Sequence, residues 1–171
     1  MSLATGAAGA QLGPRALALA ADLNKAKGLS MRKTCAILHD CFSLQLSAGG
    51  LSQALDRVAT KVQGHYQAIA EELRQAPVVH SDETSWWVAG PGWWLWVFTT
   101  QLLTFYVVAA TNNLAERQLR PAVIARKISC GNKTPKGART WQILASLAAT
   151  CAQRATSFIA ELTRAAPLQP R

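Results

Sequence analysis

This chain of 171 residues has few acidic residues and lacks both paired cysteines and an N-terminal leader pattern. Its four cysteines, at positions 35, 41, 130 and 151, form no Cys-x-x-Cys pair. That spacing argues against a structural zinc site and favours reduced thiols in a cytosol. Residues 1–15 hold neither a basic run nor a long apolar core, so we predict no secretory signal.

The chain has nine acidic residues and 18 lysines and arginines, which gives a formal net charge of +9. The positive charge is concentrated near the C-terminus, because residues 112–171 hold ten basic and two acidic side chains. Such a surface favours a polyanion as partner, and nucleic acid is the usual one. The alternative is a solvated face that only keeps the protein soluble.

Residues 13–76 have the pattern of helices, and we expect residues 1–12 to be disordered. The first helix begins at Pro14 and ends before Gly28, and Ser30 caps a second helix over residues 31–42. The Gly49-Gly50 pair is expected to break the chain, and Ser52 to cap a third helix that ends before Pro77. Two apolar stripes are expected to be buried, one in the second helix (Cys35, Leu38, Phe42) and one in the third (Leu55, Val58, Ala59, Val62, Tyr66, Ile69, Leu73).

Residues 77–110 differ in composition from the helical segment before them and are rich in β-branched and aromatic side chains. A Gly-Pro-Gly turn at 90–92 and the polar residues 99–101 divide them into strand-length pieces, which predicts three antiparallel strands in a meander. A competing interpretation is a membrane helix over residues 93–111, because residues 84–115 carry no charge. The interruption at 99–101 and the lack of basic flanks argue against it.

Residues 111–165 return to a helical pattern and form a basic region, followed by a tail at 166–171. Thr111 or Asn112 is expected to cap a helix that carries Glu116, and residues 126–137 to form a basic loop. Further helices are predicted around residues 141–151 and 158–162. The fold class is therefore α+β, a three-stranded antiparallel meander flanked by N-terminal and C-terminal helices.

Two long motifs resemble the catalytic region of insertion-sequence 66 transposases. The first spans residues 78–98 and includes HSDET at 80–84 and WWLWVF at 93–98. The second, TNNLAERQLRPAVIARKISCG at 111–131, resembles the segment that bears the last catalytic acid of the family. The helical stretch 13–73 resembles the part just upstream, so the resemblance covers about residues 13–165.

The resemblance implies a DDE-type transposase with an RNase H-like core, which cleaves and transfers DNA strands. Such enzymes hold two Mg²⁺ ions with three carboxylates, because Mg²⁺ prefers oxygen ligands. Asp82 then corresponds to the first catalytic and metal-binding acid, and Glu116 to the last. Glu83 is expected to lie outside the site of Asp82, because neighbouring strand residues point to opposite faces.

One part of the family pattern is missing. The family places a second aspartate on a later strand, whereas no acid occurs here between Glu83 and Glu116. We therefore expect an internally deleted core, truncated at its N-terminus, that is only partly RNase H-like. Mg²⁺ binding and catalysis are expected to be defective, and the edge of the first strand is expected to lack its neighbour.

Each candidate residue also has a plain structural interpretation. Asp82 suits a strand-end turn, and Glu116 with Arg120 is an ordinary pair of helical neighbours. The tryptophans at 86, 87, 93, 94 and 96 are capable of stacking on bases, although their strand context favours the core or a sheet face. The phosphate-binding candidates are basic residues of the C-terminal region: Arg117, Arg120, Arg126, Lys127, Lys133, Lys136 and Arg139.

Three functions follow as hypotheses: a transposase-derived protein whose ancestral activity was DNA strand cleavage and transfer, a DNA-binding remnant or regulator of the element without catalysis, and a decayed reading frame. The expected partner is DNA, with a homo-oligomer left open. We expect neither a membrane nor a small-molecule substrate, and a cytoplasmic, nucleoid-associated location in a bacterium.

Overall fold

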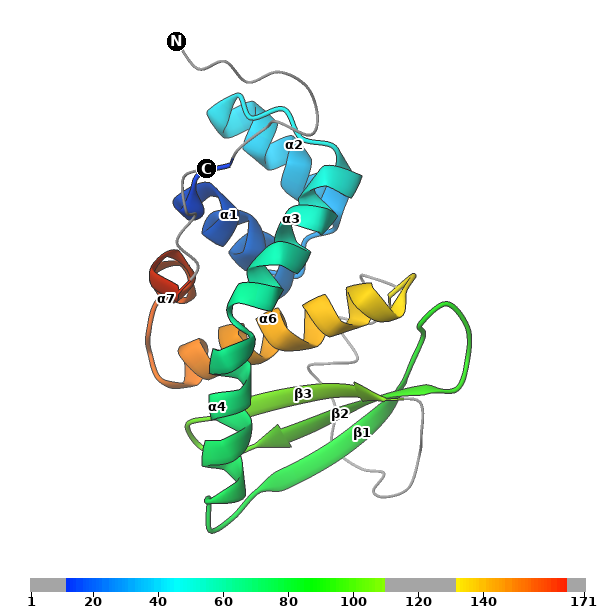
Figure 1. Ribbon diagram of the computed structural model, residues 1–171, viewed down its shortest axis with the longest axis vertical. Coiled ribbons are helices and arrows are strands. Elements are labelled where there is room, and N and C mark those ends of the chain that lie inside the picture. Colours follow the sequence, from blue (N-terminus) through cyan, green and yellow to red (C-terminus); the bar gives the residue numbers. More distant parts are fainter. Residues whose placement is uncertain (1–11, 110–131, 166–171) are drawn as a thin grey trace.

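The computed structural model describes residues 12–109 and 132–165. The strands are β1 (His80–Trp86), β2 (Trp93–Thr99) and β3 (Thr104–Ala109). The helices are α1 (Pro14–Ala21), the π-helix η1 (Asp22–Ala26), α2 (Met31–Phe42), α3 (Ala48–Lys61), α4 (Gln63–Arg74), α6 (Pro135–Gln153) and α7 (Phe158–Ala165). In Figure 1, α1, α2 and α3 gather at one end and the sheet lies at the other, with α6 between them and α4 running down beside the sheet.

The first two helices begin where their local signals predict. Pro14 occupies the first turn of α1, and the hydroxyl of Ser30 accepts a hydrogen bond from the backbone N–H of Lys33 at the start of α2. Gly28 ends the first helical segment with a φ of +71°, a conformation that glycine adopts without strain. The predicted burial of Phe42 is wrong, because this side chain is 54% exposed.

The third predicted helix differs at its start and in its continuity. Ser47, not Ser52, caps it by accepting a hydrogen bond from the N–H of Gly50 at 3.0 Å, so both glycines lie in the first turn of α3. The helix is interrupted at Val62, whose φ and ψ of −94° and 12° separate α3 from α4. The predicted buried stripe is confirmed across this interruption, from Leu55 to Leu73.

The three strands form an antiparallel meander in the order β1-β2-β3, as predicted. Asp82 pairs with Val97, which in turn pairs with Tyr106. The membrane alternative is wrong for the described part of its segment, because residues 93–99 and 104–109 are strands. No helix within residues 12–109 and 132–165 is long and apolar enough to cross a membrane. The mixed helices and sheet are consistent with a partial RNase H-like core.

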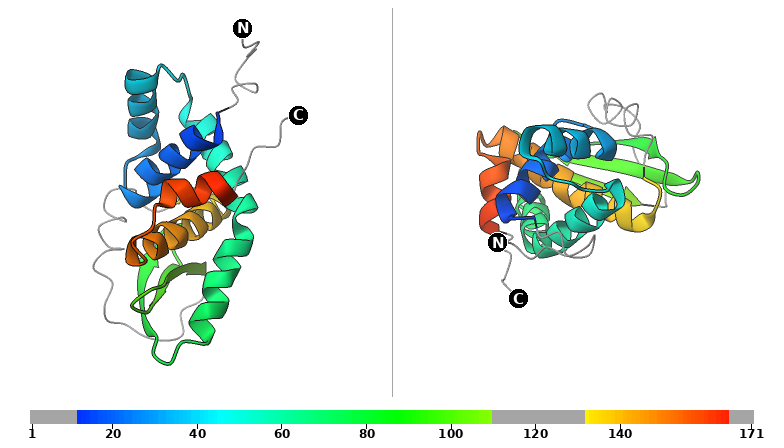
Figure 2. Two further views of the ribbon diagram at one scale, coloured as in Figure 1. Left: turned by 90° about the vertical axis from the view of Figure 1, so that its left-hand side faces the viewer. Right: turned by 90° about the horizontal axis from the view of Figure 1, so that it is seen from above.

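Helix α6 starts earlier than predicted, since the expected loop 126–137 ends before Pro135. The hydroxyl of Thr134 caps α6 by accepting a hydrogen bond from the N–H of Gly137 at 3.0 Å. The helix then runs through the middle of the main core, which it shares with the N-terminal helices and α7. Figure 2 shows α7 lying beside α1, so the N-terminal and C-terminal helices pack together.

Side chains of α6 also cover the outer edge of β3. The N–H groups of Thr104, Tyr106 and Val108 donate hydrogen bonds to the side-chain oxygens of Thr150, Ser146 and Gln142, at 3.1, 2.8 and 2.8 Å. Four helical residues advance about 6 Å and two strand residues about 6.6 Å, so the two repeats stay nearly in register. These oxygens take the place of a neighbouring strand, which protects an edge that would otherwise offer unpaired N–H groups.

Candidate functional site

Asp82 lies in the middle of β1 and is almost fully buried, with 3% of its surface exposed. One of its carboxylate oxygens accepts a hydrogen bond from the N–H of Glu83 at 2.7 Å. Glu83 is also buried. Because residues alternate along a strand, the register directs Asp82 to the face of Val97 and Glu83 to the face of Trp96.

The sheet offers few metal ligands beyond these two residues. Asp82 and Glu83 are the only carboxylates on β1, β2 and β3, and they lie on opposite faces. Within the described ranges, no group of three or more His, Cys, Asp or Glu side chains is placed to hold a metal ion. The carboxylates on these strands therefore do not fit a pair of Mg²⁺ ions, which needs several oxygen ligands on one site.

Five of the predicted site residues lie outside the described residues: Glu116, Arg117, Arg120, Arg126 and Lys127. Of the seven predicted phosphate-binding residues, the structure describes Lys133, Lys136 and Arg139. All three lie at or just before the start of α6, and Lys136 and Arg139 contact residues of α3.

Lys136 is held by an acid that the sequence analysis did not single out. Its ammonium group lies 2.9 Å from a carboxylate oxygen of Asp56 on α3, and the hydroxyl of Thr140 donates to the other oxygen at 3.1 Å. Burial alone would raise the pKa of Asp56. Hydrogen bonds from Lys136 and Thr140, with the positive charge of Lys136 and Arg139, outweigh burial and lower that pKa below its ordinary value.

Arg139 donates to two side chains across the same helix pair. Its guanidinium reaches the hydroxyl of Thr60 at 3.4 Å and the amide oxygen of Gln63 at 2.9 Å. These contacts fix its position between α3, α4 and α6. Lys136 keeps 69% of its side chain exposed despite the ion pair, so its charge stays accessible from solvent.

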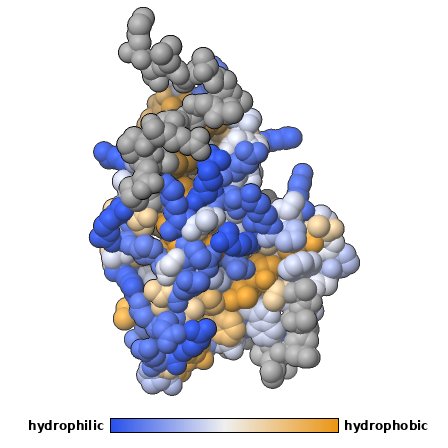
Figure 3. All heavy atoms as spheres, in the orientation of Figure 1, coloured by the Kyte–Doolittle hydropathy of each residue, from blue (hydrophilic) through white to orange (hydrophobic). Residues whose placement is uncertain are grey.

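Hydrophilic residues gather over α3 and α4 on the face shown in Figure 3. On α3, Arg57 and Lys61 are exposed one helical turn apart. We call the five basic residues on α3 and around the start of α6 the cationic strip: Arg57, Lys61, Lys133, Lys136 and Arg139.

The start of α6 is joined to the β1–β2 hairpin through Asn132. Its side-chain oxygen accepts from the indole N–H of Trp86 at 2.8 Å, and its backbone N–H donates to the carbonyl of Trp87 at 2.8 Å. Trp86 is buried and its ring lies 4.9 Å from that of Trp141 on α6. The expectation of a core position is thus met by Trp86, whereas Trp87 is 46% exposed.

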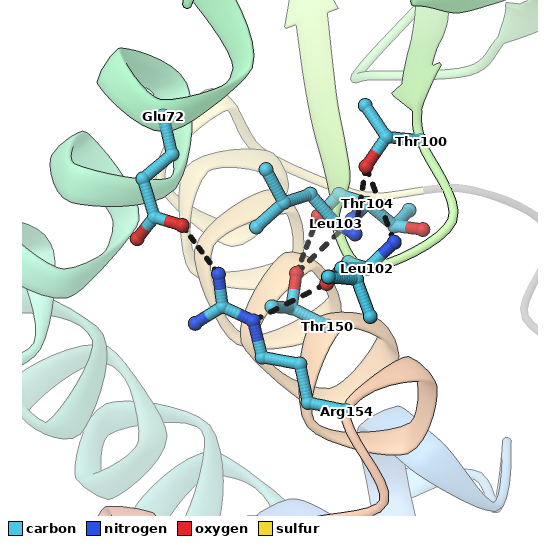
Figure 4. A network of polar contacts seen from close by, with 7 residues as sticks. All are labelled: Glu72, Thr100, Leu102, Leu103, Thr104, Thr150 and Arg154. Atoms are coloured by element: carbon cyan, nitrogen blue, oxygen red, sulfur yellow. Dashed lines mark hydrogen bonds and ion pairs between the residues drawn. The ribbon is translucent and has the colours of Figure 1, made fainter. Parts of the chain in front are cut away.

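At the opposite end of α6, Arg154 joins α4 to the β2–β3 turn (Figure 4). Its guanidinium lies 2.5 Å from a carboxylate oxygen of Glu72, and its Nε donates to the carbonyl of Leu102 at 3.3 Å. The hydroxyl of Thr100 accepts from the N–H groups of Leu102 and Leu103, which shapes the turn. Both ends of α6 are therefore tied to the sheet, and the cationic strip rests on a helix with fixed ends.

Sequence reasoning missed the contacts that cross from one segment to another. Asp56 was not among the candidates, since an isolated acid on a helix carries no local signal for its distant partner Lys136. The polar stripe on α6 (Gln142, Ser146, Thr150) recurs every four residues within residues 141–152, which are otherwise apolar. That spacing is the one signal in the sequence from which a polar face toward β3 could have been expected.

No curated protein and no solved structure is significantly similar to this chain. A family model does match it, over residues 9–110 and 99–140, and its description is "Transposase IS66 family". The matched residues amount to well over half of the 171 positions and include β1, β2, β3 and the start of α6. The chain therefore belongs to the IS66 family of transposases.

Proposed function

We propose that this transposase-derived chain is a DNA-binding protein of a bacterial insertion sequence that has lost strand cleavage and transfer. The observation that carries the proposal is the contrast between its two candidate sites. The cationic strip holds five basic residues on two helices that the Asp56–Lys136 ion pair joins, whereas the sheet offers Asp82 and Glu83 on opposite faces. The first arrangement suits phosphate binding, and the second does not suit a pair of metal ions.

The loss of catalysis is supported by the missing middle acid. The chain has no Asp or Glu between Glu83 and Glu116, and β3 ends at Ala109, two residues before the Thr111-Asn112 motif. The family match also falls into two segments, which is what an internal deletion would produce. With Asp82 and Glu116 alone, two Mg²⁺ ions would lack the bridging carboxylate that holds them together.

DNA binding is supported by the composition of the cationic strip and by how it is built. Asp56, which pairs with Lys136 of the strip, is 15% exposed, so this carboxylate orients Lys136 while presenting little negative charge to solvent. Cations along a helix junction neutralise phosphates without reading bases, and each phosphate contact releases counterions. The expected binding is therefore weak, tolerant of sequence and steeply dependent on salt.

The binding proposal is tested by the salt dependence of affinity for a duplex, with two variants that change the net charge equally. Lys133→Gln combined with Lys136→Gln should flatten the plot of log affinity against log salt by about 2 in slope, since each phosphate contact contributes about 0.9. The matched control replaces Arg32 and Lys33, both exposed on α2, by Gln and should leave the slope unchanged. Equal slopes for the two variants would contradict a role for the strip.

The catalytic proposal is tested on a supercoiled plasmid that carries the ends of the element. Soluble protein should produce no nicked or linear plasmid with Mg²⁺ or Mn²⁺. Metal-dependent cleavage that disappears in Asp82→Asn would overturn the proposal. It would mean that another residue or a second copy of the chain supplies the third acid.

A further inference from the structure

The turn that joins β1 to β2 forms an aromatic cavity of about 640 Å³. Trp86, Trp87, Trp93 and Trp94 line it together with Ser85, Pro91 and Gly92. Trp86 is buried and anchored to Asn132, whereas Trp87 is 46% exposed. The cavity therefore has one tryptophan whose position is fixed and one whose ring is open to a ligand.

The lining indicates the chemistry of that ligand. None of the described residues that line the cavity is charged, so the group inside must be neutral. The exposed ring of Trp87 beside this lining suits a flat aromatic group, which it contacts by stacking. The volume falls within the range of ligand-binding cavities and leaves room for a heterocycle.

The surroundings indicate what that heterocycle is attached to. The N–H of Asn132 donates to the carbonyl of Trp87, and the N–H of Ala89 donates to the carbonyl of Asn132 at 3.2 Å. The next residue along the chain is Lys133, which is exposed and is the member of the cationic strip just before α6. A ligand that is aromatic at one end and anionic at the other fits this combination.

We propose that the cavity binds an unpaired nucleobase of a DNA strand whose phosphates lie on the cationic strip. A base within a duplex is already stacked on both faces, whereas an unpaired base has a free π-face for Trp87. The inference deepens the proposed DNA-binding function and rests on it. It adds a preference for single-stranded or frayed DNA that phosphate contacts alone would not create.

The test compares one single-stranded DNA with a duplex of the same sequence, at one salt concentration, by fluorescence anisotropy. Trp87→Ala removes the exposed ring without changing the net charge, so electrostatic attraction is retained. It should weaken binding to the single strand about tenfold, as expected for one lost stacking contact, and leave duplex binding unchanged. Trp87→Phe should restore most of the affinity, because a phenyl ring also stacks.

Phe42→Ala is the matched control, since Phe42 is 54% exposed on α2 and lies on a helix that does not line the cavity. Phe42→Ala should change the affinity for neither the single strand nor the duplex. A single 2-aminopurine in the strand should lose fluorescence on binding in the wild type and in Trp87→Phe, but not in Trp87→Ala.

The outcomes separate the two proposals. Suppose that duplex binding keeps its salt dependence while Trp87→Ala changes the affinity for neither DNA or weakens both affinities equally. The base site is then wrong, and the proposal for the cationic strip stands. If the single strand binds through Trp87 but the duplex shows no salt-dependent affinity, the strip is wrong and the base site stands. Self-association without DNA that depends on Trp87 would overturn the base site, because a second copy of the chain would then occupy it.

Discussion

Ser146→Ala is expected to destabilise the protein, because it removes the oxygen that accepts the N–H of Tyr106 on the edge of β3. Ser146 is fully buried, so water cannot take the place of the lost oxygen. Leaving a buried donor without an acceptor costs about 1–3 kcal/mol. The higher helix propensity of alanine offsets roughly 0.5 kcal/mol of that cost. We therefore expect a net loss of about 0.5–2.5 kcal/mol, or a fall in Tm of roughly 1–10 °C.

Urea denaturation followed by circular dichroism measures this difference, with Ser52→Ala as the matched control. Ser52 is exposed on α3, so its replacement should leave stability unchanged or slightly raised. Thr150→Val keeps the side-chain shape but removes one bond accepted from the Thr104 N–H and one donated to its carbonyl, so it should cost at least as much. Equal stability of Ser146→Ala and Ser52→Ala would refute the idea that α6 side chains stabilise the edge of β3.

Three further predictions concern stability. Val62→Asp places a charge at a fully buried position and should cost several kcal/mol, about 3 or more; an unchanged Tm would disprove the buried face. Burial lowers the pKa of Lys25 to about 8, so this group binds more protons in the unfolded state between pH 8 and about 10.4, and its contribution to stability rises with pH in that window. Lys25→Met should remove this contribution and raise stability at pH 7, and a variant whose stability changes with pH as that of the wild type does would contradict this. The lowered pKa of Asp56 contributes stability that is full above about pH 4 and lost as the pH falls through the folded-state value, so Asp56→Asn should flatten acid unfolding in that range.

Much of the secondary structure could be predicted because its signals are local. The cap at Ser30, the proline at Pro14 and the turn at 90–92 act within a few residues, and each begins or ends an element as predicted. The apolar stripe from Leu55 to Leu73 predicts a buried face even though the helix is interrupted at Val62. The spacing of apolar residues predicts which face is buried, not whether the helix is continuous. The buried face is preserved because the N–H of Tyr66 still donates to the carbonyl of Val62 across the interruption.

The errors arose where two local signals compete or where the decisive contact is distant. Ser47 and Ser52 are both plausible caps, and the glycine pair pointed to the later one. Glycine is nevertheless tolerated in the first turn of a helix, where its N–H is available to a capping hydroxyl. The contact between Asp56 and Lys136 joins residues 80 positions apart, and no local pattern predicts which acid meets which cation.

Folding of this chain and the catalysis of the family depend on different groups of residues. The main core is formed by the N-terminal helices, α4, α6 and α7, and its residues lie on both sides of the sheet in sequence. The outer edge of β3 is covered by side chains of α6 and needs no further strand. A deletion between β3 and the Thr111-Asn112 motif would therefore remove the middle acid while leaving the helical core, and the α3–α6 junction that carries the cationic strip, intact. DNA binding would then outlast catalysis, because phosphate contacts depend on charges along a stable helix pair, whereas strand cleavage needs three carboxylates at one point.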